Sequence, residues 1–131
     1  MTRAAVVFRV DRARTQFLPA LVVTRIGPIP PLGRVPGAPP ELAGMAQTEN
    51  EILPVVDLRD KSITSGVLLV CSYMTETLGV IVGEVIGVSH YEIDPEAQDS
   101  ILVGDARVRA LDLGKIYARL QSASFVSRVV G

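Results

Sequence analysis

The stretch Ile52-Leu53-Pro54-Val55-Val56-Asp57-Leu58-Arg59 and the proline-rich segment before it carry the most distinctive sequence of the chain. Residues 52–59 are rich in β-branched side chains and end in charged ones, which predicts a strand followed by a turn. Six of the nine prolines lie within residues 28–40. Fixed φ angles and missing N–H donors exclude a helix or a paired strand through this segment, so we predict a loop.

Two interpretations of this loop differ in function. Its P-x-x-P spacing fits a polyproline ligand of an SH3-type partner. The other interpretation is an ordered surface connection that Ile29, Leu32 and Val35 anchor to the core. We favour the ordered connection.

The remaining elements extend outward from this centre. The segments predicted as strands are residues 4–10, 17–23, 67–72, 78–85 and 106–112. The first two should form one hairpin, with Pro19 at an edge, and the next two a second hairpin. Residues 41–45 fit one helical turn, and the polar residues 90–100 fit a loop.

A short helix is predicted after the last strand. Leu113, Ile116, Tyr117 and Leu120 follow the spacing i, i+3, i+4 and i+7, and Asp112 stands at the N-cap position. Residues 121–131 fit either a continuation of this helix or an edge strand. The most apolar strand positions predict the core, namely Val6, Phe8, Val55, Val70, Val80 and Ile81.

The amino-acid composition limits the classes of function that are possible. The 131 residues carry 13 Lys plus Arg against 14 Asp plus Glu, so no basic field favours nucleic acid. With 48% hydrophobic and 21% charged residues the chain should fold, as a single domain over residues 1–131. No run reaches the length of a membrane helix, and the first residues lack the apolar core of a secretory signal. We therefore expect a cytoplasmic protein without direct membrane insertion.

Residues that carry chemistry are few. His90 lies in a polar segment, and Cys71 lies inside an apolar strand, where a thiol is inert. One Cys and one His give no credible zinc set, and no phosphate-binding loop occurs. Strand-end hydrogen bonding or helix capping explains Asp57 and Asp112. We therefore expect no catalytic residue, no metal and no cofactor.

A known family shares the central motif. Residues 34–40, Gly44 and residues 52–59 closely resemble the chemotaxis coupling protein CheW and the matching regulatory domain of the CheA histidine kinase. The resemblance implies a mainly β fold of two small, interlocked, five-stranded SH3-like barrels, with a hydrophobic groove between them and a short C-terminal helix. It also implies an adaptor that bridges the chemoreceptor cytoplasmic tip and the kinase regulatory domain.

The resemblance places the partner-binding residues in the motif, the turn before residue 52 and the strand at 78–82. These residues are Arg34, Val35, Gln47, Glu49, Asn50, Leu78 and Val80. One departure concerns residues 45–51, where the family usually has Val-Ile-Asn-Leu-Arg-Gly-Arg. The family's arginine associated with receptor contact corresponds to Glu49, so its charge is inverted, and Asn50 replaces the glycine. This suggests a divergent member, with an accessory role or a changed partner.

Two further hypotheses come from other classes. A small β-barrel module could bind an effector in the groove between the barrels, and a hydrolase with an unfamiliar site is the third. The motif at residues 34–59 favours the adaptor.

We predict that Glu49→Arg raises the affinity for a standard receptor tip. A receptor shaped for arginine offers acidic or carbonyl groups, and like charges at an interface cost several kcal/mol. Each 1.4 kcal/mol corresponds to about tenfold in affinity. Titration of both variants against a receptor fragment at two salt concentrations tests this. Tight binding by the natural protein, with no gain from Glu49→Arg, would contradict it.

Overall fold

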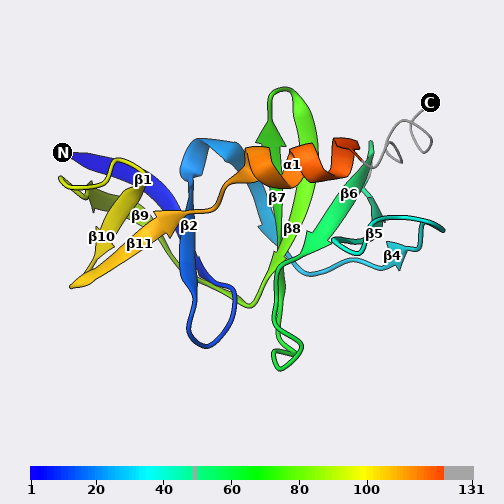
Figure 1. The fold of residues 1–131 in the computed structure, drawn as a ribbon, viewed down its shortest axis with the longest axis horizontal. Coiled ribbons are helices and arrows are strands. Elements are labelled where there is room, and N and C mark those ends of the chain that lie inside the picture. Colours follow the sequence, from blue (N-terminus) through cyan, green and yellow to red (C-terminus); the bar gives the residue numbers. More distant parts are fainter. Residues whose placement is uncertain (49, 123–131) are drawn as a thin grey trace.

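Two β-sheet units and one helix make up the computed structural model, which describes residues 1–48 and 50–122 (Figure 1). The first unit is a closed barrel. Its strands, in spatial order, are β1 (Thr2–Arg9), β2 (Thr15–Pro19), β11 (Ala106–Ala110), β10 (Ser100–Val103) and β9 (Glu84–Ile93). The second unit is a six-stranded sheet. Its strands, in spatial order, are β3 (Val23–Gly27), β7 (Val67–Tyr73), β8 (Glu76–Val82), β6 (Ile52–Asp57), β5 (Leu42–Gln47) and β4 (Leu32–Gly33).

The chain path interlocks the two units. It starts in the barrel with β1 and β2, leaves to build the whole six-stranded sheet, and returns with β9. β9 then pairs with β1 from Arg9 opposite Glu84 to Thr2 opposite Glu92. The mainly β fold is thus confirmed. The expectation of two five-stranded barrels holds for the first unit. It is corrected for the second, which within the described residues is a sheet of six strands with β3 and β4 at its edges.

Strands at the centre of the molecule are buried on both faces. Successive side chains point to opposite faces of a strand, and here each face meets a separate core. In β1, Ala5 and Val7 enter the barrel core, whereas Phe8 enters the core between the units. In β7, Leu69 enters this central core and Val70 the core of the second sheet. All six residues predicted for the core are buried, namely Val6, Phe8, Val55, Val70, Val80 and Ile81.

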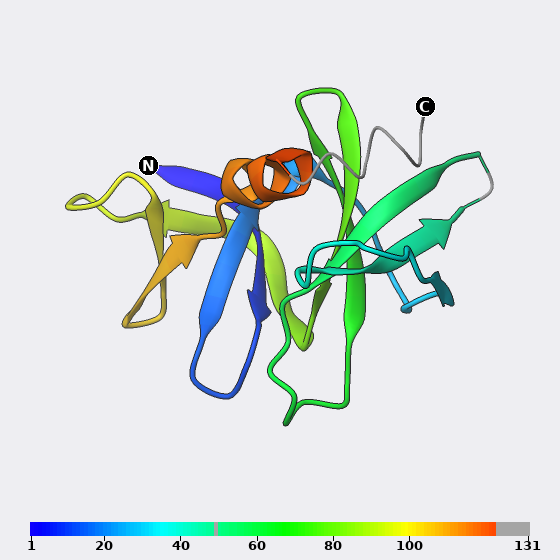
Figure 2. The ribbon, with the colours of Figure 1, turned by 45° about the vertical axis from the view of Figure 1, so that its right-hand side comes forward.

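Helix α1 (Leu113–Ser122) covers the junction between the units (Figure 2). Asp112 caps it as predicted, because its Oδ1 accepts a hydrogen bond of 3.0 Å from the Lys115 N–H. Leu113 and Leu120 pack into the central core. The predicted helix is confirmed, and the ambiguous tail at residues 123–131 lies outside the described residues.

Prolines and glycines set several boundaries that the sequence pattern misplaced. The predicted strand 17–23 ends at Pro19, a short 3-10 helix (η1, Ala20–Val22) follows, and β3 begins the second sheet. Pro19 has no N–H with which to extend the ladder. The predicted loop 28–40 contains the two-residue strand β4, and the predicted helical turn at 41–45 is wrong, because β5 pairs there with β4 and β6.

The predicted loop at 90–100 is wrong in its first residues. β9 continues through His90 to Ile93, and β10 begins at Ser100. One face of β9 is largely exposed, so its polar residues hide the strand in the sequence. A register shift near Gly87 disrupts the ladder between β9 and β1, and a Cβ at Gly87 would clash with the Tyr91 hydroxyl. Glycine at this position therefore permits both the bulge and the close approach of the Tyr91 side chain.

Truncation of one buried isoleucine tests the core. Ile81 is 1% exposed in the core of the second sheet, so Ile81→Ala should lower the free energy of unfolding by about 2 to 5 kcal/mol. Ile52→Ala is the matched control, because Ile52 is 60% exposed and surface changes stay within about 0.5 kcal/mol. Urea denaturation of both variants measures the effect. An unchanged midpoint for Ile81→Ala would contradict the assignment.

Candidate functional site

Two of the predicted contact residues, Gln47 and Asn50, lie at the end of β5 and in the turn that leads to β6. Thr48 closes it, because its N–H and its hydroxyl both donate to the Glu51 carbonyl oxygen, at 2.8 and 3.2 Å. Gln47, Asn50 and Glu51 are exposed. Glu49, the residue with the inverted charge, lies outside the described residues. The turn is therefore tied at its ends and offers polar side chains to solvent.

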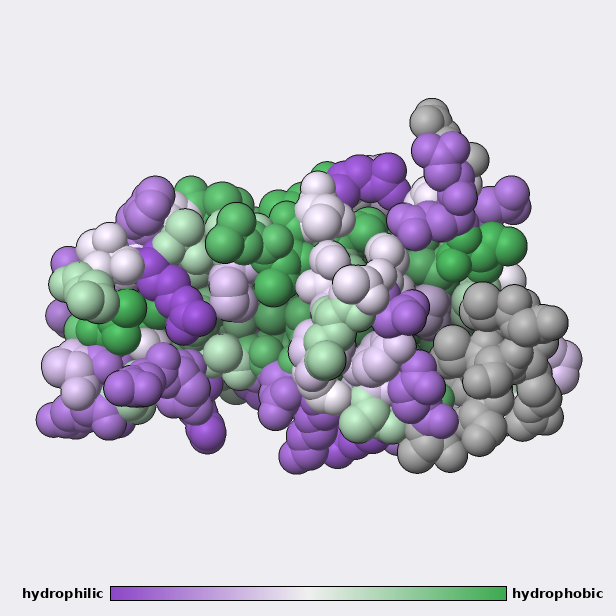
Figure 3. Space-filling model, turned by 90° about the horizontal axis from the view of Figure 1, so that it is seen from above, coloured by the Kyte–Doolittle hydropathy of each residue, from purple (hydrophilic) through white to green (hydrophobic). Residues whose placement is uncertain are grey.

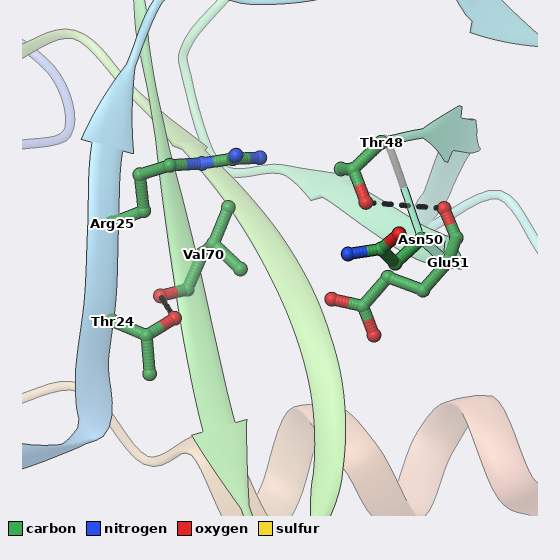
Figure 4. A pocket seen from close by; sticks show the side chains of 6 residues that line it. All are labelled: Thr24, Arg25, Thr48, Asn50, Glu51 and Val70. Carbon is green, nitrogen blue, oxygen red and sulfur yellow. Dashed lines mark hydrogen bonds between the residues drawn. The ribbon is translucent and has the colours of Figure 1, made fainter.

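This turn faces β3 across a hollow of about 270 Å³, here called the charged groove (Figure 4). The groove is lined by Thr24, Arg25, Thr48, Asn50, Glu51 and Val70. Thr24 and Arg25 come from β3, the next three from the turn, and Val70 from β7. The Thr24 hydroxyl donates to the Val70 carbonyl oxygen at 3.1 Å, which holds β3 against β7.

A second hollow continues the charged groove along β3. It has a volume of about 550 Å³ and shares Arg25, Thr48 and Val70 with the groove. Its apolar lining includes Ile26 and Leu68. The free edge of β3 therefore borders a channel that is charged at one end and apolar at the other.

The structure separates the other predicted contact residues. Arg34 is exposed and Val35 is half-buried against the central core, and both line a hollow of the proline-rich loop. Leu78 and Val80 have no exposed surface. They are strand residues of the central core, so the prediction that they contact a partner is corrected. Ile29 and Leu32 pack against the core of the second sheet, as predicted for an ordered loop.

Sequence reasoning missed Thr24 and Arg25. The pattern placed the end of the second strand at residue 23, so both residues fell between predicted elements. The only available signal was an arginine beside Ile26 in an otherwise apolar stretch. Their position opposite a turn more than 20 residues later depends on the pairing of β3 with β7, which local sequence does not encode.

The motif's final residues stabilise the following loop. Arg59 donates to both carboxylate oxygens of Asp57, at 3.0 and 2.8 Å, and to the carbonyl oxygens of Thr64 and Ser65. Burial acts to raise the pKa of Asp57. The hydrogen bonds and charge of Arg59 outweigh it and lower that pKa below its usual value. Asp57 therefore serves strand-end hydrogen bonding, as predicted.

The two residues with potential reactivity, His90 and Cys71, do not lie in one site. His90 is exposed on β9, whereas Cys71 is fully buried in the central core. Burial raises the pKa of the Cys71 thiol to about 12. Residues 1–48 and 50–122 contain no group of three or more side chains suited to hold a metal ion. Within the same residues, no helix has the length and apolarity needed to cross a bilayer.

Comparisons with known proteins give one family and one fold. The family model of the CheW-like domain matches residues 4–112. Among solved structures, the scaffolding protein TtCheW from Thermoanaerobacter tengcongensis is similar, with a TM-score of 0.72 and 17% sequence identity. The alignment covers 86% of this chain and 90% of that protein. A search of the curated proteins gave no match.

The buried thiol predicts a pH dependence above pH 9. The raised pKa means that the folded state keeps the Cys71 proton which the unfolded state releases from about pH 9 upward. The stabilisation is complete below pH 9 and is lost as pH rises toward 12, by at most about 1.4 kcal/mol per pH unit. Denaturation of the natural protein and Cys71→Ala across this range isolates the thiol's contribution. Equal pH slopes, or rapid thiol labelling of the folded protein at neutral pH, would contradict the prediction.

Proposed function

This chain belongs to the CheW-like domain family, and from this premise we propose that it is a non-catalytic adaptor linking chemoreceptors to a CheA-type histidine kinase in the cytoplasm. The observation that carries the proposal is the family match over residues 4–112, which includes the motif at residues 34–59. The shared central core supports treating the two units as one domain.

An adaptor requires surfaces rather than reactive groups. The exposed residue Arg34 lines a hollow at the proline-rich loop. Asn50 lines the charged groove, and Gln47 lines the hollow that continues it along β3. Apolar pockets with polar rims are typical of protein interfaces. We assign the charged groove to the receptor and a different surface to the kinase, because a linking protein must bind both at once.

One observation favours the ligand-binding alternative. Apolar side chains gather where the two units meet (Figure 3). A hollow of about 390 Å³ lies at this junction, with Leu18, Val22, Tyr73 and Leu113 in its lining. This volume is within the usual range of small-molecule sites, about 300 to 1,000 Å³. Asp99 and Asp112 also line it, which would favour a cationic or hydrogen-bond-donating ligand.

Simultaneous binding distinguishes the two functions. Size-exclusion chromatography and calorimetry of the purified chain with a receptor cytoplasmic fragment and a kinase regulatory domain should give a ternary complex. Each partner alone should also bind, without weakening the affinity for the other. Mutual competition would contradict a linking role. A small molecule that co-purifies with the chain, while neither protein binds, would support the ligand-binding module instead.

A further inference from the structure

We propose that the charged groove selects a partner segment with an acidic side chain opposite Arg25 and a basic side chain opposite Glu51. The inference rests on the proposed function, because it takes the receptor tip as that partner. It goes further by assigning the charges that the receptor must present and by naming Arg25 as a contact residue.

The two charges lie on opposite walls of the groove. Arg25 projects from β3 toward the turn, and the Glu51 side chain extends from the turn toward Val70 (Figure 4). Both residues are exposed. Among the described residues, neither side chain takes part in an ion pair. Both charges are therefore available to a bound partner.

The sheet edge beside these charges is also available. Among residues 1–48 and 50–122, β3 pairs with β7 on one side only, since it ends the order of the second sheet. Ile26, the residue after Arg25, is 40% exposed and lines the apolar continuation of the groove with Leu68. A partner segment that crosses the groove would cover this apolar surface and meet both charges.

Opposite charges on two walls favour selection among partners. A partner segment whose charges all have one sign is attracted by one wall and repelled by the other. A segment with an acidic and a basic side chain is attracted by both walls. Glu51 gives the wall formed by the turn a negative charge, and Arg25 gives the β3 wall a positive one. The wall formed by the turn therefore favours a basic receptor side chain, and the β3 wall an acidic one.

A second copy of this chain is a less suitable occupant. Two β3 edges would have to pair, but the register shift between Val23 and Arg25 disrupts the strand. The charge of Arg25 and the following Pro28 are also features that oppose pairing between edge strands.

Charge reversal tests the proposal. The probe is the cytoplasmic-tip fragment of a chemoreceptor from the same organism, and calorimetry compares the natural chain with Arg25→Glu, Glu51→Arg and the double variant. Arg25→Gln replaces Arg25→Glu if that variant has a lowered thermal midpoint. Matched controls are Arg12→Glu and Glu76→Arg, exposed charges outside the groove.

We expect each groove variant to weaken binding about tenfold at low salt, with a smaller loss at high salt. The double variant should bind most weakly, and the controls should bind like the natural chain.

Several outcomes would overturn the proposal. Recovery of natural affinity in the double variant would mean that Arg25 and Glu51 serve each other rather than a partner. Receptor binding that changes less than about twofold in both single variants would refute the groove alone and leave the adaptor function intact. A dimer of the natural chain that Arg25→Glu abolishes would assign the groove to a second copy. If the natural chain binds neither receptor nor kinase domain, the proposed function fails and this inference fails with it.

Discussion

The central core between the two units is the constraint on which the rest of the structure depends. β1, β2, β6, β7 and β8 each contribute side chains to it, and α1 closes it with Leu113 and Leu120. Because these strands are buried on both faces, a register slip by one residue would exchange the side chains of two cores at once. Phe8 and Leu69 in this core are fully buried. Neither unit therefore keeps its packing without the other.

This shared core leaves the charged groove at the periphery of the second sheet. Leu68 and Val70 point away from the central core, toward the smaller core behind the groove. β3 lies against β7 at the sheet edge, and no strand of the described part of the chain pairs with its outer side. The rigid strands thus hold Arg25 opposite the β5–β6 turn, while the groove between them stays open. A fixed spacing between two charges is what a selective binding surface requires.

The motif that reveals the family mainly serves structure. Val55 and Val56 enter two different cores, and Asp57 and Arg59 hold the following loop through their own hydrogen bonds. The charged groove that we propose for receptor binding lies instead between the adjoining turn and β3. In this proposal, the residues that reveal the family differ from those that contact the partner.

The sequence by itself determined the mainly β class, the two hairpins, the helix at Leu113 with its Asp112 cap, and six core residues. Period-2 and period-3.6 patterns are local, so a short window of residues suffices to show them. Through the resemblance to a family, it also predicted the turn before Ile52 as a contact surface. Only the tertiary structure decided that β9 continues through His90, that Leu78 and Val80 are inaccessible, and that Arg25 faces Glu51. Each of these depends on pairing between strands far apart in the chain: β9 gains its ladder from β1, and Arg25 is positioned by the pairing of β3 with β7. Such long-range pairing leaves no periodic signal in the residues that it brings together.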